Sequence, residues 1–438
     1  MQSPEDLPLE DPAQARQVVA EACFSPPADA PALGRVGVES ESFPIRAGSD
    51  WRDTCRLRLP LVETVLASVD APFGRFTVEP GGQVEHSTAV HPTASGAVSE
   101  LERGASTLAR AFDTCGTVLA ATGLDVWHDP STVPQQLTAP RYLAMADYFV
   151  KRGHHGQVMM RHTCSLQVNL DLGPPGVAEE RWLVANLATP VITATFACSP
   201  RGDASSGRAL AWMGLDPTRT GVPRLLVAGT MDTDPVTQLW DFALRADVLL
   251  IRTPGGGAVP GTPGWSFSDW LREGHPQHGK PSVADLLYHL STLFPEVRAR
   301  GFLEFRGVDA MPSRWRAVPV TLLAGMLYDD RARSEIGGVL ARYQRHLPAL
   351  LRRAATVGIA DPELCALAVE TWSLALAGAY RLPNGYFRSN DLFRTGAFLD
   401  WFTLRGRCPA DELRERLEVG TRAALVWATE PVEERSRR

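Results

Sequence analysis

Five glutamates stand in short segments whose apolar and polar residues alternate as they do in β-strands. Glu39 and Glu41 are two residues apart and share one face of an extended segment, while Glu79 and Glu85 flank a Pro-Gly-Gly turn. Glu304 stands between two apolar neighbours. Carboxylate oxygens are the ligands that Mg²⁺ prefers, and bound Mg²⁺ commonly bridges to phosphates. Because clustered carboxylates repel one another unless cations neutralise them, the pattern indicates Mg²⁺–nucleotide chemistry.

A plainer interpretation places the same glutamates on solvent-facing strands, since a half-buried strand turns its polar residues to water. Arg306 favours the cleft, because it follows Glu304 by two residues on the same strand face. The sequence contains no GxxxxGK[ST] loop and no GxGxxG after a strand, so ATP would depend on metal ions and dispersed arginines. It also contains no GxSxG elbow for a nucleophile.

Alternation and helical periodicity place these residues on elements of both kinds. Strands are expected within residues 34–43, 75–85, 158–172 and 301–309, and helices at 99–122, 141–149, 179–196, 282–294 and from 317 onward. The Gly- and Pro-rich stretch 253–264 predicts a surface loop, with a lid over the site as one option. Helices that separate acid-bearing strands predict an α+β enzyme whose sheet lines a charged cleft.

Composition narrows the class of protein. The 438 residues hold 44 Lys+Arg against 50 Asp+Glu, and this mild acidity argues against broad nucleic-acid binding. No apolar run approaches a membrane span, and the N-terminus lacks the pattern of a signal peptide. Seven cysteines without a CxxC pair indicate reduced thiols in the cytoplasm. We divide the chain into a lead-in (1–32), a catalytic domain (33–410) and a C-terminal helix with a frayed tail (411–438), and expect a monomer or homodimer.

Several sequence motifs follow one another along the chain in an order that is typical of one protein family. They are GVESESF at 37–43, VEPGGQVEHS at 78–87, RYLAMADYF at 141–149, GQVMMRHTCSLQVNLDLG at 156–173, LDPTRTG at 215–221, WSFSDW at 265–270, the run 286–319 and LLAGMLYD at 322–329. With these motifs the chain resembles glutamate–cysteine ligases of the plant and proteobacterial type, and the related actinobacterial enzymes that feed ergothioneine synthesis. The resemblance covers residues 34–410, most of the chain.

The resemblance implies a fold and a reaction. The fold is glutamine-synthetase-like, with a curved antiparallel sheet enclosing the active site and helices outside. In the reaction, ATP phosphorylates the γ-carboxylate of L-glutamate, and the α-amine of L-cysteine attacks the resulting γ-glutamyl phosphate. The products are γ-glutamylcysteine, ADP and phosphate, and the dipeptide serves ergothioneine or glutathione biosynthesis.

The resemblance also implies roles for single residues. Arg306 and Glu304 match the catalytic pair, with Arg306 meeting the phosphate or the substrate carboxylate. Gln167 and Asn169 match a sheet position that faces substrate or metal, and Arg219 is a candidate ligand of nucleotide phosphate or substrate. The Mg²⁺ ligands implied are Glu39, Glu41, Glu79, Glu85 and Glu304.

The chain departs from the family pattern near the expected acceptor pocket. His86 stands where the family usually has leucine, and it could contact substrate or cap its strand. Two alternatives therefore stay open: a γ-glutamyl ligase with another amine acceptor, and a catalytically weak protein that binds glutamate or nucleotide for regulation. The complete set of acidic residues and Arg306 favour an enzyme over the regulatory protein.

Overall fold

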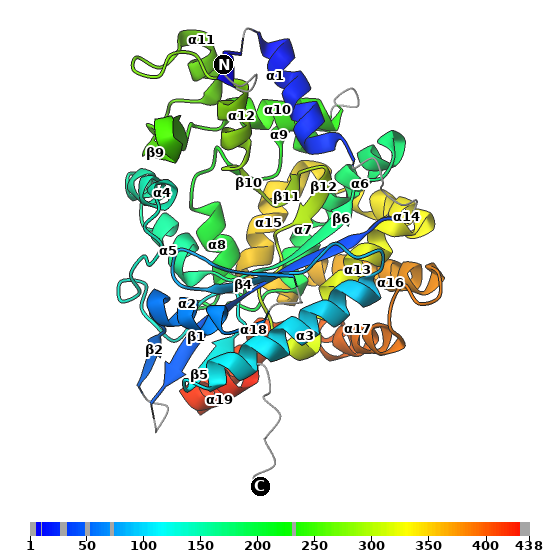
Figure 1. Cartoon of the computed structure of the whole chain (residues 1–438). Helices are drawn as coiled ribbons and strands as arrows, with labels where there is room; N and C mark the ends of the chain where they lie inside the picture. The colour runs from blue at the N-terminus through cyan, green and yellow to red at the C-terminus, as the bar shows by residue number, and fades with distance from the viewer. Residues whose placement is uncertain are drawn as a thin grey trace.

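The computed structural model describes residues 6–9, 11–26, 33–48, 53–70, 74–229 and 234–429, and these form an eight-stranded antiparallel sheet surrounded by helices (Figure 1). The sheet runs in the order β11–β12–β6–β1–β4–β3, and β2 and β5 also pair with β1. Its strands are β1 (Val36–Ala47), β2 (Thr54–Arg56), β3 (Arg75–Val78), β4 (Val84–Ser87), β5 (Thr117–Ala120), β6 (Leu166–Asp171), β11 (Val297–Ala299) and β12 (Phe302–Phe305). Two small pairs lie apart from it, β7 (Thr220–Gly221) with β10 (Phe294–Pro295) and β8 (Leu250–Thr253) with β9 (Gly257–Pro260).

Strand β1 organises the sheet. Its first half pairs with β6 on one side and β4 on the other, and its second half pairs with β5 and β2. Val36 and Val38 are buried in the core. Since side chains alternate along a strand, Glu39 and Glu41 are placed on the opposite face from these valines. The strand expected at 34–43 is confirmed.

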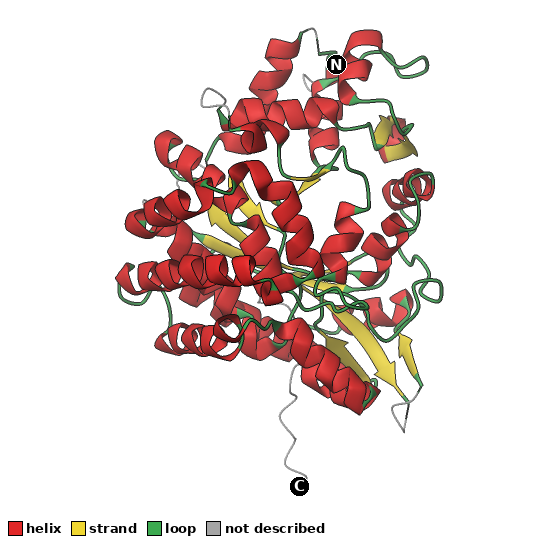
Figure 2. Cartoon of the chain, turned by 180° about the vertical axis from the view of Figure 1, so that it is seen from behind, coloured by secondary structure: helices red, strands yellow, loops and turns green. Residues whose placement is uncertain are grey.

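Seen from behind, helices lie in front of the sheet (Figure 2). The helix α13 is buried along its whole length and contacts β6, α3, α16 and α17, as expected of a helix that is apolar all round. The helices are α1 (Pro12–Val19), α2 (Leu59–Ala67), α3 (Ala94–Asp113), α4 (Pro140–Val150), α5 (His155–His162), α6 (Pro175–Leu187), α7 (Thr189–Thr195), α8 (Gly207–Met213), α9 (Arg224–Ala228), α10 (Pro235–Arg245), α11 (Phe267–Glu273), α12 (Val283–Leu290), α13 (Ala317–Tyr328), α14 (Asp330–Ala341), α15 (Leu347–Thr356), α16 (Pro362–Arg381), α17 (Ser389–Trp401), α18 (Pro409–Val419) and α19 (Thr421–Ala428).

A second group of helices stands beyond the β11–β12 end of the sheet, in the upper part of Figure 1. Here α1 contacts α10 and α12, and it continues into a π-helical turn, η2 (Ala20–Phe24). Ser282 begins α12 with a capping box to Asp285, which confirms the start of the helix expected at 282–294. The helix ends at Leu290, since Phe294 belongs to β10. Residues of α10 and α12 in this group and of α4 and α5 line the cavity described below.

The α+β class with an antiparallel sheet is confirmed, but three other expected elements also differ. The helix expected at 99–122 begins earlier, after Thr93 as its N-cap, and ends at Asp113, since residues 117–120 form β5 beside β1. Of the segment 158–172, the first part belongs to α5 and only 166–171 is strand. The stretch 253–264 lies largely in the β8–β9 hairpin, and none of these residues lines the cavity described below.

One boundary of the proposed division can be located on the helices. The boundary at 410/411 falls inside α18, and α19 joins the sheet region through a hydrogen bond from Ala121 N to Ala428 O (2.9 Å). The frayed tail expected at the C-terminus lies outside the described residues from 430 on. The lead-in contains α1 and η2.

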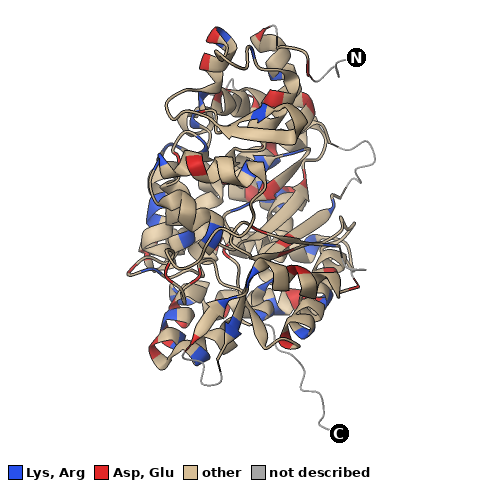
Figure 3. Cartoon of the chain, turned by 60° about the vertical axis from the view of Figure 1, so that its left-hand side comes forward, with Lys and Arg blue, Asp and Glu red and all other residues tan. Residues whose placement is uncertain are grey.

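Three general features accompany this fold. Among the described helices, none combines the length and the apolar composition that crossing a bilayer requires. All seven cysteines are free thiols. Acidic and basic residues are interspersed along the described ribbon (Figure 3).

Candidate active site

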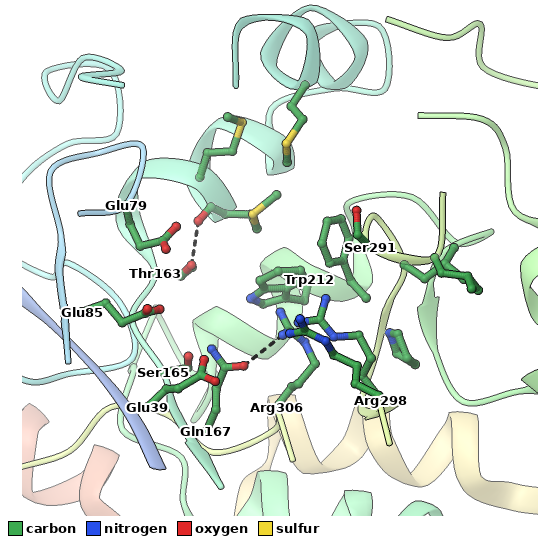
Figure 4. Close-up of a pocket in the computed structure, with 18 of the residues that line it drawn as sticks. Glu39, Glu79, Glu85, Thr163, Ser165, Gln167, Trp212, Ser291, Arg298 and Arg306 are labelled. Carbon is green, nitrogen blue, oxygen red and sulfur yellow. Dashed lines mark hydrogen bonds between the residues drawn. The ribbon is translucent and has the colours of Figure 1, made fainter. Parts of the chain in front are cut away.

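A cavity of about 650 Å³ opens on the polar face of the sheet. Strands contribute charged and amide side chains to it, and helices contribute sulfur-containing and aromatic walls (Figure 4). Its lining includes Glu39, Glu41, Gln167 and Arg306 from or next to the sheet, Glu79, Gln83 and Glu85 around the turn after β3, Met145, Met159 and Met160 from α4 and α5, Arg208 and Trp212 from α8, and Arg298 and Arg300 next to β12.

Four glutamates, Glu39, Glu41, Glu79 and Glu85, form what we call the acidic side. Glu41 lies directly opposite Glu85 in the β1–β4 ladder. Small donors hold these carboxylates: Ser165 donates from its backbone N (2.8 Å) and its hydroxyl (2.9 Å) to Glu41. Asn169 Nδ2 donates to Glu39 Oε1 at 3.0 Å. The strand register therefore gathers carboxylates from segments distant in the sequence.

A tight turn at residues 80–82 presents Glu79 to the cavity. Gly82 has φ of +81°, a conformation that favours glycine, and a Cβ on Gly81 would lie 2.5 Å from Arg161 Cα. The buried Arg56 donates from Nη2 to Gly81 O (2.9 Å), while its Nη1 pairs with Asp125 at 3.0 Å. The Pro-Gly-Gly sequence is thus required by the close approach of the turn to α5.

Burial and mutual repulsion raise the pKa values of three carboxyl groups on the acidic side. The pKa of Glu39 and the pKa of Glu41 rise to about 7, and the pKa of Glu79 rises to about 8. Desolvation is the largest cause in each case, followed by the charges of neighbouring glutamates. A bound cation would remove this repulsion and favour the charged carboxylates.

The other wall, which we call the basic side, consists of Arg298, Arg300 and Arg306 around Glu304. Arg298 donates to both carboxylate oxygens of Glu304 (2.8 and 3.0 Å), and Arg306 also donates to this carboxylate. Arg300 Nη1 lies 3.6 Å from it. Burial alone would raise the pKa of Glu304, but Arg298 and Arg306 outweigh burial and lower that pKa to about 2.

Gln167 links the two sides. Its Oε1 accepts a hydrogen bond from Arg306 Nη1 at 3.0 Å, drawn as a dashed line in Figure 4, and its Nε2 donates to Glu41 Oε1 at 3.4 Å. The ring of Trp212 lies 5.3 Å from the Arg306 guanidinium carbon. Arg306 is therefore oriented from three directions by Glu304, Gln167 and Trp212.

Most of the residues singled out from the sequence meet in this cavity, and three do not line it. Glu304 lies behind the arginines, and Asn169 reaches the cavity through Glu39. Arg219 requires a correction: it is fully buried, pairs with Asp216 (3.0 Å) and donates to Thr292 O (2.9 Å), so its guanidinium serves internal packing. The residues that do line the cavity are Glu39, Glu41, Glu79, Glu85, Gln167 and Arg306.

His86 also has a clear place. It is buried between Phe76, whose ring centre is 4.9 Å away, and Gly104, where a Cβ would lie 2.1 Å from its ring. It does not line the cavity. The departure from the family pattern at this position therefore concerns packing of α3 on the sheet.

Sequence reasoning missed Arg298 and Arg300. They precede Gly301, whose φ of +73° makes the turn between β11 and β12, and Arg298 is the register partner of Glu304. An Arg-Ala-Arg-Gly pattern before a strand with Glu304 was a usable signal for this hairpin. The methionines from α4 and α5 carried no such signal, because methionine fills apolar gaps in any core.

The donor chemistry of the acidic side fits a hard divalent cation, because it offers carboxylate oxygens from four side chains. Within the described ranges, no three His, Cys, Asp or Glu side chains are already gathered in metal-ligating positions. The basic side offers guanidinium donors for phosphate or carboxylate oxygens. One cavity can thus hold a metal–phosphate group and an anionic substrate together.

Comparisons with known proteins agree with this chemistry. The sequence profile of glutamate-cysteine ligase family 2 matches residues 35–434. The chain is 31% identical over 435 residues to a glutamate–cysteine ligase EgtA of Mycobacterium tuberculosis, covering 97% of this chain and 94% of that protein. It is 34% identical over 406 residues to the EgtA of Mycolicibacterium smegmatis, covering 90% of each. A chloroplastic glutamate–cysteine ligase of Medicago truncatula is 29% identical over 66% of this chain and 57% of its own length.

A solved structure supports the fold. The glutamate–cysteine ligase of Francisella tularensis in complex with AMP superposes with a TM-score of 0.56 and 12% sequence identity. The match covers 91% of this chain and 88% of that one. At this identity the likeness concerns the fold.

Proposed function

The chain belongs to glutamate-cysteine ligase family 2, and we propose that it joins the γ-carboxylate of L-glutamate to the amine of L-cysteine in a reaction driven by ATP. The observation that carries this proposal is the cavity in which the acidic side and the basic side meet across Gln167. The products are γ-glutamylcysteine, ADP and phosphate, and the dipeptide supplies a low-molecular-weight thiol, ergothioneine or glutathione.

The reaction needs positive charge near the transferring phosphoryl group. A carboxylate is a poor electrophile, and phosphorylation turns one of its oxygens into a leaving group. The amine of cysteine then attacks the carbonyl carbon, a C–N bond forms, and phosphate leaves. We assign Arg306 to the transferring phosphoryl group, because Glu304 and Gln167 orient its guanidinium toward the cavity.

We assign the acidic side, Glu39, Glu41, Glu79 and Glu85, to holding Mg²⁺. When bound there, Mg²⁺ neutralises the charge of the ATP phosphates. For Glu304 the contacts favour a positioning role, since Arg298 already occupies both of its oxygens. Metal ligation by Glu304 stays a prediction that would require Arg298 to release it.

The apolar side chains of the cavity protect the acyl phosphate from water. Trp212, Phe294 and the methionines of α4 and α5 line the cavity beside the charged groups. Such a wall excludes water, which would otherwise hydrolyse the intermediate before cysteine attacks. The proposed reaction needs no covalent intermediate between the substrate and the protein.

The first test measures ADP release by the full chain with Mg²⁺-ATP and L-glutamate, with and without each of the twenty amino acids. Stimulation by cysteine alone, with γ-glutamylcysteine identified by mass, is the expected result. Stimulation by a different amino acid keeps the mechanism and changes the acceptor. Absence of glutamate-dependent ADP release from folded protein would overturn the proposal and favour a regulatory binding protein.

We also propose that the protein works in the cytoplasm, which its seven free thiols support. We expect it to act as a monomer or a homodimer on small-molecule substrates. Sedimentation velocity of the purified chain distinguishes these two states.

A further inference from the structure

The N-terminal segment contributes a wall to the cavity. Ala22 and Cys23 of η2 line it together with Arg298 and Arg300 of the basic side. These two residues lie before residue 35, where the match to the family profile begins. The cavity therefore has one wall outside the residues that the family profile matches.

Several contacts anchor this segment. Asp11 caps α1 by accepting a hydrogen bond from Gln14 N at 2.8 Å. Arg16 of α1 pairs with Asp234 at the start of α10, with 2.8 Å between Nη2 and Oδ2. Before the helix, Leu9 N donates to Pro281 O at 2.8 Å. The segment is thus docked on the ends of α10 and α12.

The turn η2 is joined directly to the hairpin that carries the arginines. Gly301 N donates to Cys23 O at 2.8 Å, and Gly301 makes the turn between β11 and β12. Phe24 packs edge-on against the ring of Trp182, with ring centres 5.4 Å apart. A π-helical turn is uncommon and often occurs at functional sites. Here it brings Ala22 and Cys23 to the cavity edge beside Arg300.

The neighbouring arginines leave room for a ligand. The side chain of Arg300 is 56% exposed, and its contact with Glu304 is 3.6 Å, longer than a hydrogen bond. Burial raises the pKa of Cys23 to about 12, so its thiol adds no negative charge beside the arginines. An incoming anionic group at this edge of the cavity would therefore meet guanidinium donors next to the small side chain of Ala22.

We propose that η2 is a specificity wall, in which the small side chain of Ala22 sets the room available to an anionic substrate group bound by Arg298 and Arg300. The group is a carboxylate of an amino-acid substrate or a phosphate of ATP, which share this chemistry. The inference rests on the proposed function, since it refines how the same cavity selects its substrates.

The test enlarges Ala22 in steps, as Ala22→Leu and Ala22→Phe, in the full chain. Ala13→Phe is the matched control, because Ala13 is an exposed alanine of the same segment that does not line the cavity. We expect Ala22→Phe to raise the KM of one substrate about tenfold, with kcat nearly unchanged and a smaller rise for Ala22→Leu, as steric crowding of a bound group predicts. The control variant keeps the wild-type KM for ATP, L-glutamate and L-cysteine.

The arms of the experiment identify the anionic group. A rise confined to ATP assigns a phosphate to the arginines, and a rise confined to L-glutamate or L-cysteine assigns a carboxylate. Unchanged KM values for all three substrates in folded Ala22→Phe would overturn the specificity wall. Calorimetric Kd values for ATP and L-glutamate provide the same comparison without turnover, so a wild-type protein that forms no product refutes the proposed function alone.

Discussion

On the acidic side of the cavity, burial and neighbouring carboxylates raise the pKa of Glu79 to about 8, whereas on the basic side arginines lower the pKa of Glu304 to about 2. Glu304 is fully buried within β12, and Glu79 is half-buried directly after β3 of the same sheet. The difference is that Glu304 has its counter-charges within the chain, while the acidic side has fewer than it needs. The carboxylate of Glu304 is neutralised by arginines of the chain itself, whereas the acidic side depends on a cation from solution.

The largest effect is expected from Arg306→Lys. Lysine keeps the charge but cannot donate in one plane to both Glu304 and Gln167. Loss of an oriented donor at a developing charge lowers kcat by about 10²–10³-fold. Steady-state kinetics measure this, with Arg331→Lys on an exposed helix face as the control that keeps wild-type rates. An Arg306→Lys enzyme within a few-fold of wild type would remove Arg306 from the phosphoryl site.

Glu304→Gln tests how much the ion pairs between Glu304 and the arginines of the basic side stabilise the fold. Removing one partner of a buried ion pair leaves the arginines uncompensated, so the free energy of unfolding should fall by about 3 kcal/mol. Urea denaturation at pH 7 measures it. The exposed pair partner Glu335 provides the control Glu335→Gln, which should change stability by about 0.5 kcal/mol or less. Equal stability of Glu304→Gln and wild type would contradict the charge balance described here.

In metal-free protein, Glu79→Gln should raise the free energy of unfolding, in contrast to Glu304→Gln. The pKa of Glu79 is about 8 in the folded chain against an ordinary value of 4.5. The folded state therefore binds this proton more tightly, and its contribution to stability is full below pH 4.5 and lost as pH rises through 8. At pH 9 with EDTA, removing the carboxylate should stabilise the fold by on the order of 2 kcal/mol.

Added Mg²⁺ gives the control for that prediction. A ligand at a hundred times its Kd stabilises the folded state by about 2.7 kcal/mol, and wild type should gain more from Mg²⁺ than Glu79→Gln does. Thermal unfolding with and without Mg²⁺ measures both gains. Destabilisation of metal-free Glu79→Gln at pH 9 would show that repulsion does not dominate the acidic side.

The smallest effect on catalysis is expected from Arg219→Lys. Arg219 is buried with Asp216 away from the cavity, so its replacement should lower the free energy of unfolding by about 1–2 kcal/mol. The KM for ATP should stay within about twofold of wild type. A selective rise in that KM would restore Arg219 as a nucleotide contact.

Local patterns in the sequence predicted the acid-bearing strands and the turn at residues 80–82. Period-two alternation around Glu39 and the Pro-Gly-Gly sequence after Glu79 are properties of neighbouring residues, so they can be recognised without the fold. The strand β5 was missed, because its Thr-Val-Leu-Ala sequence continues an apolar helical pattern and becomes a strand only by pairing with β1.

Where the site differs from its prediction, the reason is again pairing or packing between residues that are distant in the sequence. Arg219 was assigned from a loop motif, but its burial depends on Asp216 and Thr292, which the fold brings around it. The role of Ala22 depends on the docking of α1 against α10, between residues more than two hundred positions apart. Long-range packing of this kind leaves no periodic trace in the sequence.

The central place of β1 has a consequence for how the chain is made. Its partners β4 and β5 follow within about eighty residues. Val38, however, pairs with Val168 of β6, which is synthesised later, and β6 pairs with β12, which is synthesised later still. At a synthesis rate of about 5–20 residues per second, β1 emerges from the ribosome roughly ten seconds before β6. During that interval one edge of a long strand is unpaired and can pair with other chains. We therefore expect chaperones to protect the nascent chain from aggregation.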